Sequence, residues 1–380
     1  MIGEHVVITS LSENTKNDGA QGSRFLSLQE AIDYAEPGDS IYLHPGTYVG
    51  DVVVNKELLT IRGDCIDDVI IAGHVQVLAD DTTMQHLMVA GGPAAAGIHV
   101  TARDCKFNTV RCLGNADGMV FEGVTDSHVD ACEFIGNVGY GIKLTAASTN
   151  NELRDCFATG NGHGYGVFDS PLNRVFDNAA HTNAGIGLNV VRSNNCTIQS
   201  QMAQYGSVGV RFEESDGNVF FTGNVQWNGA GIQFVDSDNN TVYSTPVQLN
   251  SVIDFDFDAD SNTNTIAHNF YNTKTDLGVG NRWQSNHLNS PSYDQDVATV
   301  AYAKAASRRG LFEFDSLGDL MLANTVNSVS EYELDTEGGL MPLEPNSDEN
   351  FEWDMSGDVQ PRNLVMVCNR LDSVGDAELM

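Results

Sequence analysis

The sequence is poor in basic residues. Its 380 residues include 19 Lys and Arg against 52 Asp and Glu, which gives a formal net charge of −33. The densest group of basic residues is the pair Arg308 and Arg309. The chain therefore lacks a basic patch that could bind phosphates, and we expect no nucleic-acid partner. Repulsion among so many acids weakens a compact fold in ordinary buffer, whereas molar salt screens it. The composition favours a protein adapted to high salt, with an acidic surface that only aids solubility as the alternative.

Cysteine pairs and long apolar runs are also missing. The cysteines at positions 65, 105, 112, 132, 156, 196 and 368 form neither a CxxC pair nor a small disulfide framework, so we expect them to be reduced. The opening residues lack a charged start followed by an apolar block, and nothing later approaches a membrane-spanning run. We expect a soluble protein that is made in the cytoplasm and does not insert into a membrane.

What the sequence does contain is a repeat. The pattern Gly-apolar-x-apolar begins at residues 97, 118, 141, 164, 187, 209 and 231, with a degenerate copy at 251–254. Alternation with a period of two marks strands, and its return every 20 to 23 residues predicts that like residues stack from coil to coil. One inward column should hold Ile98, Met119, Ile142, Tyr165, Leu188, Val210, Ile232 and Ile253. The other should hold Val100, Phe121, Leu144, Val167, Val190, Phe212, Phe234 and Phe255.

A second register consists of asparagines that precede an apolar residue by two or three positions. Asparagine tolerates left-handed backbone angles, and stacked amides can hydrogen-bond from one coil to the next. We therefore predict a structural ladder at the turns made of Asn151, Asn173, Asn195, Asn218, Asn240 and Asn264.

The repeat and its opening resemble the right-handed parallel β-helix, or pectin-lyase-like, family. An amphipathic helix from Ser27 to Ala35 is followed by "PGDSIYLHPGTY", and in that family such a helix caps the open end of the core. The leucine scaffold and helical halves of a leucine-rich repeat are absent. The resemblance, over roughly Ser27 to Tyr271, implies an all-β fold: a single-stranded parallel β-helix of about ten coils. We assign residues 1–26 to an N-terminal segment and 27–284 to the capped β-helix.

A different repeat follows the β-helix. Residues 285–310 are predicted to be a linker with a short helix, and residues 311–380 a small β-hairpin domain for attachment or oligomerisation. Its units are "FEFDSLGDL", "YELDTEGGL" and "FEWDMSGDV", in which two strands flank an Asp-x-x-Gly turn. Structural calcium on the turn acids is an alternative that no motif supports; its ligands would be Asp315, Asp319, Asp335, Asp354 and Asp358.

Enzymes of the resembled family place catalytic groups on the outside of consecutive coils, so exposed columns identify candidates. One column holds four successive charged residues, Asp169, Arg192, Glu214 and Asp236. Carboxyls on adjacent coils lie near the separation that retaining glycosidases use, so Glu214, Asp236 and Asp169 are the candidate catalytic acids. The alternative is a solvated ladder stabilised by one arginine. A shift of one residue would turn the column inward.

Sugar binding on the same rod is the milder hypothesis. Aromatic side chains offer flat apolar surface to sugar rings, and basic side chains bind their polar groups. The candidate binding residues are Arg192, Arg211, Lys143, Phe168, Tyr205 and Trp227. The four cations Lys143, Arg174, Arg192 and Arg211 are scattered along the sequence without the local motif of a pectate lyase. No metal ligand set or cofactor motif is found, and neutral glycans suit an acidic rod better than polyanions do.

Three function classes remain open. The first is a virion structural protein of a salt-loving host's virus: a spike or fibre, expected to be a homotrimer, that binds host-surface glycans and contacts other virion proteins through its C-terminal domain. Such a protein is made in the host cytoplasm and released with the virion. The second is an extracellular glycoside hydrolase or polysaccharide lyase, and the third is a cellular surface or adhesion protein.

Overall fold

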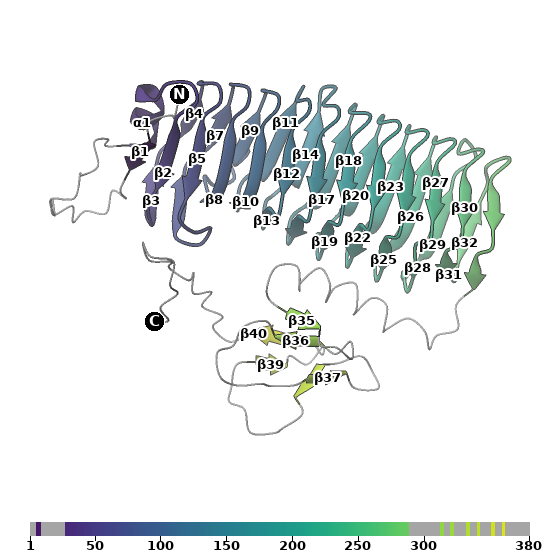
Figure 1. The fold of residues 1–380 in the computed structure, drawn as a ribbon. Helices are drawn as coiled ribbons and strands as arrows, with labels where there is room; N and C mark the ends of the chain where they lie inside the picture. The colour runs from purple at the N-terminus through teal and green to yellow at the C-terminus, as the bar shows by residue number, and fades with distance from the viewer. Residues whose placement is uncertain are drawn as a thin grey trace. The chain divides into compact units, whose positions relative to one another are not determined.

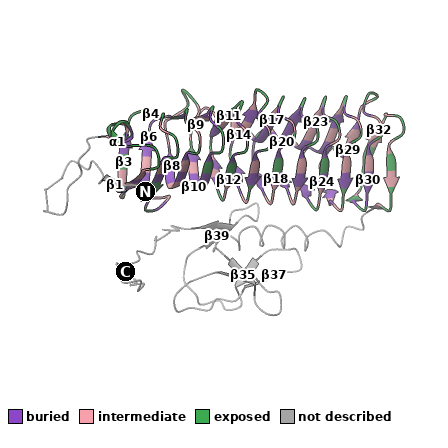
Figure 2. Ribbon diagram, turned by 45° about the horizontal axis from the view of Figure 1, so that its top comes forward, coloured by how far each residue is buried: buried purple, intermediate pink, exposed green. Residues whose placement is uncertain are grey.

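The computed structural model describes residues 5–8, residues 27–288 and six short strands between residues 312 and 361, with side chains described for residues 27–286. Residues 1–294 form one compact unit and 295–380 another. Parallel strands of the first unit stack along a common axis (Figure 1). Its apolar residues face the space inside the coils, and along the strands of both sheets buried residues alternate with less buried ones (Figure 2). The predicted parallel β-helix is confirmed.

Two sheets build the β-helix. The eleven-stranded sheet consists of β4 (Val52–Val54), β7 (Val75–Val77), β9 (Ile98–Val100), β11 (Met119–Glu122), β14 (Tyr140–Thr145), β17 (His163–Phe168), β20 (Ile186–Val191), β23 (Val208–Glu213), β26 (Ala230–Val235), β29 (Ile253–Phe257) and β32 (Lys274–Asp276). The 21-stranded sheet bends at a turn in most coils and consists of β1 (His5–Ile8), β2 (Ser40–Leu43), β3 (Gly46–Val49), β5 (Thr60–Gly63), β6 (Val69–Ala72), β8 (Thr83–Val89), β10 (Lys106–Leu113), β12 (His128–Asp130), β13 (Glu133–Ile135), β15 (Glu152–Arg154), β16 (Phe157–Thr159), β18 (Arg174–Phe176), β19 (Ala179–His181), β21 (Thr197–Gln199), β22 (Met202–Gln204), β24 (Val219–Phe221), β25 (Asn224–Gln226), β27 (Thr241–Tyr243), β28 (Val247–Gln248), β30 (Thr265–Ala267) and β33 (Arg282–Gln284).

The predicted capping helix is α1 (Leu28–Tyr34). Ser27 is its N-cap, and the Ser27 hydroxyl accepts a hydrogen bond from the Glu30 amide at 3.1 Å. Leu28, Ala31 and Ile32 are buried, so the apolar face of the helix covers the first coil as predicted. Strand β1, which the sequence did not reveal, pairs with β2 and extends the same end.

The inward columns match the prediction over seven coils. Ile98 pairs with Met119, and the series continues through to Ile232, with side chains fully or almost fully buried. The last coil is a correction, because Ile232 pairs with Phe255 and Phe234 with Phe257. Ile253 is instead the partner of Ala230 and lies two residues before the column. The predicted columns were thus two residues out of register at their end.

Ladders of polar side chains stabilise the turns. In the predicted ladder Asn218 and Asn240 each accept a hydrogen bond at 2.8 Å from the backbone amide one coil earlier, and Asn151, Asn173 and Asn264 belong to the same series. Asn195 does not, because Cys196 occupies that position, and the prediction is wrong there. A serine ladder at another turn runs through Ser148, Ser170, Ser193, Ser215, Ser237 and Ser261. Buried amides are thereby paired where the strands end.

The coils continue slightly past the predicted boundary. β31 (Phe270–Tyr271) pairs with β34 (His287–Leu288), so residues 285–288 complete the last coil instead of beginning a linker. Further on, three antiparallel pairs coincide with the second repeat. They are β35 (Phe312–Phe314) with β36 (Leu320–Leu322), β37 (Tyr332–Leu334) with β38 (Leu340–Pro342), and β39 (Phe351–Trp353) with β40 (Val359–Pro361). Their packing lies outside the described side chains, so the hairpin domain stays a prediction.

Two further findings concern membrane-spanning helices and the cysteines. In the described part of the chain, no helix has the length and apolar character needed to cross a membrane. Cys105, Cys112, Cys132, Cys156 and Cys196 are free and buried, as expected. Cys65 is disulfide-bonded, so the expectation that all cysteines are reduced is wrong at that position.

Candidate functional site

The outer face of the eleven-stranded sheet carries a group of polar and aromatic side chains that contact one another across several coils. On this face the outward positions of successive strands form columns, and neighbouring coils place unlike residues side by side. We call the set the Tyr140 cluster; it comprises Asp117, Tyr140, Lys143, His163, Phe168, Asn189, Arg211 and Glu213.

Aromatic rings form the centre of this cluster. The Tyr140 ring stacks on the His163 ring, with centroids 4.6 Å apart and planes 16° apart. Phe168 meets Tyr140 edge-on, at 5.3 Å and 83°. Gly166 makes this arrangement possible, because a Cβ there would lie 2.4 Å from Phe168 Cε2 and 2.9 Å from Tyr140 Cδ1. The missing side chain therefore lets Tyr140 lie across the neighbouring strand.

Hydrogen bonds fix these rings in place. Asn189 Nδ2 donates to Tyr140 Oη at 3.2 Å, from two coils further along the chain. Asp117 joins two neighbours, since its carboxylate pairs with Lys143 Nζ at 2.6 Å and accepts from the Tyr140 amide at 2.7 Å. His163 Nδ1 accepts from the Ile186 amide at 3.0 Å. With Nδ1 acting as acceptor, the neutral ring carries its proton on Nε2.

The protonation states follow from burial. Desolvation lowers the pKa of His163, and Asp117 opposes that shift only in part. Desolvation also raises the pKa of Tyr140. At neutral pH the cluster thus presents a neutral imidazole with an Nε2–H donor and a protonated phenol. Both are hydrogen-bonding groups, and the Nδ1 lone pair that the neutral imidazole would use as a base is occupied by the Ile186 amide.

Two buried polar atoms of the cluster lack a partner within the described residues. They are Oδ1 of Asn189, a residue that is only 7% exposed, and Nε of Arg211. Arg211 Nη2 is occupied by Glu213 at 3.1 Å. Because buried polar groups are almost always hydrogen-bonded, this unpaired acceptor and unpaired donor on neighbouring strands mark a place where water or a polar ligand can bind.

The predicted charged column lies on the turns that follow the strands of this sheet. Asp169, Arg192, Glu214 and Asp236 have φ values of 47° to 49° and are exposed, so the column faces solvent. Arg192 turns toward Asp169, with Nε to Oδ1 at 2.7 Å and Nη2 to Oδ2 at 3.0 Å. These hydrogen bonds lower the pKa of Asp169. Partial desolvation and nearby carboxylates, Asp260 foremost, raise the pKa of Asp236.

Tyr205 and Trp227 occupy a different turn, between the 21-stranded sheet and the start of β23 and β26. Their rings are offset-stacked on each other, 5.4 Å apart at 7°, and His181 meets Tyr205 edge-on at 5.0 Å. Each ring face is thus partly covered by its neighbour. The structure therefore separates these two aromatics from Phe168, which lies in the Tyr140 cluster.

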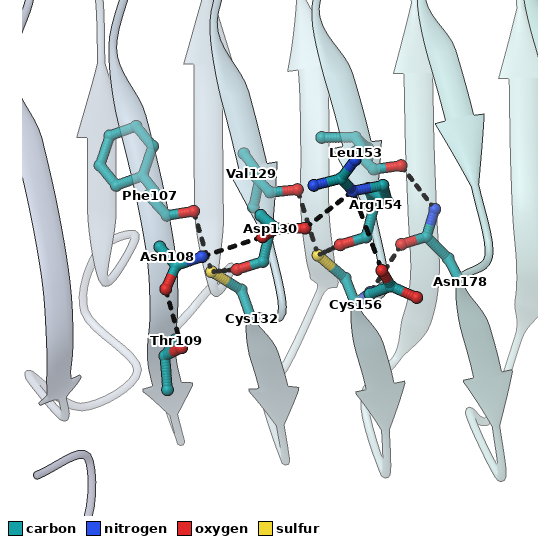
Figure 3. Close-up of polar contacts among 11 residues, drawn as sticks. Phe107, Asn108, Thr109, Val129, Asp130, Cys132, Leu153, Arg154, Cys156 and Asn178 are labelled. Atoms are coloured by element: carbon teal, nitrogen blue, oxygen red, sulfur yellow. Dashed lines mark hydrogen bonds and ion pairs between the residues drawn. The ribbon is translucent and has the colours of Figure 1, made fainter. Parts of the chain in front are cut away.

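The 21-stranded sheet carries a hollow of about 230 Å³ on its outer surface, between β10, β12 and β15. Figure 3 shows Asp130 between Asn108 and Arg154; Asn108 Nδ2 donates to Oδ2 at 2.9 Å, and Arg154 Nε pairs with Oδ1 at 3.0 Å. Cys132 and Cys156 lie at the turn below, where their thiols contact backbone carbonyls. Burial raises the pKa of the Cys132 thiol, so it stays protonated.

Sequence comparison identifies the fold family. A model described as "Right handed beta helix region" matches residues 59–201 and 94–247, the part of the chain that holds both the Tyr140 cluster and the hollow. The chain is a right-handed β-helix protein. No curated protein matches the sequence significantly.

Solved β-helix structures are similar at low identity. The alginate lyase AlyGC of the PL6 family is 12% identical, with 90% of this chain and 56% of that chain covered at a TM-score of 0.53. Tailspike protein 2 of an Escherichia coli O157:H7 bacteriophage is 16% identical, covering 63% and 40% at 0.50. The periplasmic alginate epimerase AlgG is 14% identical, covering 66% and 73% at 0.44. The β-helix is therefore a fold that a phage tailspike shares with an alginate lyase.

The β-helix brings some predicted site residues together and separates others. Lys143, Phe168 and Arg211 lie on the same outer face, although Lys143 and Arg211 are scattered along the sequence. Arg192 belongs to the column of acids, and Arg174 lies on the other sheet. Within the described residues, no three His, Cys, Asp or Glu side chains are arranged to hold a metal ion. The five turn acids considered for calcium lie outside those residues.

The sequence did not lead to the prediction that Tyr140, His163 and Asn189 belong to one site. Aligning the outward position between the two inward columns gives Lys143, Gly166, Asn189 and Arg211 on consecutive strands. A glycine in a column of long polar side chains is the available signal, because it marks the gap that a neighbouring ring fills.

Proposed function

We propose that this protein is a spike or fibre component of a virion from a salt-rich environment, and that its β-helix recognises host-surface glycan at the Tyr140 cluster. The observation that carries the proposal is the pair of unpartnered buried atoms, Asn189 Oδ1 and Arg211 Nε, beside the stacked rings of Tyr140 and His163. Apolar ring surface next to fixed donors and acceptors is the arrangement that small polar ligands such as sugars use.

The protonation states favour binding over catalysis. A lyase or an epimerase needs a side chain that removes a proton, yet burial holds Tyr140 as the phenol, and the Ile186 amide occupies the Nδ1 lone pair of His163. A hydrolase needs two paired carboxyls, and the column that holds Glu214 and Asp236 is solvent-exposed, with its arginine bound to Asp169. Glu214, Asp236 and Asp169 stay a hypothesis as catalytic acids.

The assembly is part of the proposal. The three hairpins of the second repeat suit a homotrimeric attachment module that contacts other virion proteins, because short exposed strands gain from pairing between chains. Production in the host cytoplasm and release with the virion would suit a spike; an extracellular protein is the alternative.

The test is to mix the purified protein, in molar salt, with polysaccharide stripped from host cells and to follow both by size-exclusion chromatography. Co-elution at full glycan length supports a binding spike. Shortened glycan would make the protein a depolymerase, and independent elution would remove glycan recognition.

Variants then locate the binding site. Tyr140→Phe deletes only the hydroxyl that Asn189 contacts. Asn189→Ala removes the buried side-chain amide whose Oδ1 is unpaired. We expect each to weaken binding by about tenfold, which corresponds to about 1.4 kcal/mol. Tyr34→Phe, at an exposed tyrosine of the capping helix, is the matched control and should bind like the unaltered protein. Equal affinity of all three variants would place recognition elsewhere.

A further inference from the structure

His163 is held in the Tyr140 cluster by a hydrogen bond that only a neutral imidazole can make. Its Nδ1 accepts at 3.0 Å from the backbone amide of Ile186, on the neighbouring strand β20. A backbone amide is always a donor, and both nitrogens of a protonated imidazole are donors too. Protonation therefore sets two donors against each other, and turning the ring over presents only the second donor or a carbon. The contact is lost in either orientation.

The position of the His163 ring depends on both neighbouring coils. From the preceding coil the Tyr140 ring stacks on it, with centroids 4.6 Å apart. On the following coil Gly185 leaves room for it, because a Cβ at that residue would lie 2.4 Å from His163 Cε1 and from Nδ1. The imidazole therefore couples the Tyr140 ring to the backbone of β20, and it does so only while Nδ1 can accept.

The charged groups around His163 come from other strands. Strands β17 and β20, both described throughout, contain no Asp, Glu, Lys or Arg. Burial lowers the pKa of His163 below its usual value, and Asp117, two residues before β11, opposes that shift. On β14, Lys143 binds the Asp117 carboxylate at 2.6 Å. On β23, Arg211 and Glu213 pair with each other at 3.1 Å. Asp117 is therefore the counter-charge for a protonated His163.

Asp117 is already engaged in the neutral cluster. Its carboxylate binds Lys143 and also accepts from the Tyr140 amide at 2.7 Å. An imidazolium that turned toward Asp117 would leave the Tyr140 ring and compete for the carboxylate that anchors the backbone of the same residue. Tyr140 would lose both its stacked neighbour and its anchor, and the Asn189 amide would lose the hydroxyl to which it donates. One proton would thus disturb the residues that carry the proposed recognition.

We infer that protonation of His163 frees Tyr140 from its binding arrangement, so that the cluster binds its ligand at neutral pH and releases it in acid. The inference rests on the proposed glycan recognition at this cluster, and it adds the regulation of that site. The direction follows from the hydrogen bond, because the neutral ring is the form that completes it. Since one proton is involved, affinity should be constant above about pH 6.5 and fall by at most about tenfold per pH unit below the pKa of His163.

The experiment measures the affinity of the full chain for polysaccharide stripped from host cells, by calorimetry at pH 8 and at pH 5 in molar KCl. Molar salt screens surface charges within about 3 Å, so the titration of distant acids contributes little. We expect about tenfold weaker binding at pH 5, the effect of excluding one proton from the bound form over about one pH unit. Equal affinity at the two pH values would overturn the inference.

Two variants identify the titrating group. In His163→Gln the side-chain oxygen can still accept from the Ile186 amide, but it does not titrate. Whatever affinity this variant retains should therefore be the same at pH 8 and pH 5. His128→Gln removes an exposed histidine from β12 on the other sheet and should keep the full pH dependence. A pH dependence that persists in His163→Gln, or that disappears in His128→Gln, would contradict the assignment.

A second measurement needs no ligand. The near-ultraviolet circular dichroism of the folded chain should change between pH 8 and pH 5, because Tyr140 loses its stacked neighbour. The change should be absent from His163→Gln and present in His128→Gln, with the far-ultraviolet spectrum constant in all three proteins. An identical change in His163→Gln would mean that other groups cause it, and the inference would be wrong.

This measurement separates the inference from the proposed function. If no host glycan binds at any pH but the spectrum changes through His163, the proposed function is wrong and the release of Tyr140 is supported. If glycan binding depends on Tyr140 but not on pH, the proposed function stands and the inference is wrong. Binding that Tyr140→Phe weakens, and whose pH dependence disappears in His163→Gln together with the spectral change, supports both.

Discussion

The two sides of the same strands obey different rules. On the inside, Leu188, Val210 and Ile232 follow one another in register, and each packs on its equivalent one coil away. On the outside, the residues beside them are Asn189, Arg211 and Gln233, which share no chemistry beyond polarity. An inward residue must fit the identical position of its neighbours, whereas an outward residue is limited only by solvent and ligands. The repeat is therefore a property of the core, and function lies where the repeat is broken.

The largest effect should come from breaking an inward stack. Phe234 is buried and stacks on Phe212 at 5.2 Å and on Phe257 at 4.3 Å. Phe234→Ala should cost about 3–5 kcal/mol, because it leaves a cavity between two coils. The measurement is chemical denaturation in molar KCl, followed by circular dichroism. Val235→Ala, at the next and outward position, should cost less than about 1 kcal/mol; similar losses for the two would contradict the contrast between the two sides.

The asparagine ladder should give the next largest effect. Asn240 Oδ1 accepts from the Asn218 amide at 2.8 Å, and its Nδ2 donates to the Ser215 carbonyl at 2.9 Å. Asn240→Ala leaves these buried groups unpaired and should cost about 1–3 kcal/mol in the same denaturation assay. Asn195→Gly is the control: that asparagine is exposed at a φ of 58°, a conformation that glycine adopts easily. A large loss in the control would mean that Asn195 has a role outside the ladder.

The contrast also explains what the sequence could predict. The period, the capping helix and seven members of each inward column follow from apolar residues that must stack. The error at Ile253 has a simple cause, because a shift of two residues keeps the alternation intact and exchanges one apolar position for another. The prediction for Asn195 was wrong for a similar reason, because Asn195 is adjacent to Cys196, which occupies the ladder position.

The candidate site was predicted only in pieces. Lys143, Phe168 and Arg211 could be selected singly as cations and an aromatic, but their neighbours depend on side chains that cross coils. Tyr140 reaches Asn189 over Gly166, a contact between residues 49 positions apart. Columns of equivalent positions cannot show such a contact, because it joins different columns and depends on rotamers.

A smaller effect is expected from pH, through His163. Burial lowers its pKa in the folded state below the ordinary value of 6.5, so the unfolded chain binds the proton more readily. Stability from this residue is complete above about pH 6.5 and is lost as the pH falls through that value toward the folded pKa. Denaturation between pH 8 and pH 5 should therefore show a decline that is shallower in His163→Gln. Parallel pH profiles would mean that His163 is solvated in the folded protein.

The smallest effect should come from the charged column, the outward set that does follow the repeat. Arg192 and Asp169 are exposed, and a solvated ion pair contributes little because water and salt screen it. Arg192→Gln should leave the denaturation midpoint unchanged, and Glu214→Gln and Asp236→Asn should leave both the affinity for host glycan and its length unchanged. The same chromatography that tests recognition measures this. If either acid variant stops a shortening that the unaltered protein causes, the column is catalytic. Function would then lie in outward residues that follow the repeat as well as in those that depart from it. That result would contradict the contrast drawn between the two sides of the strands.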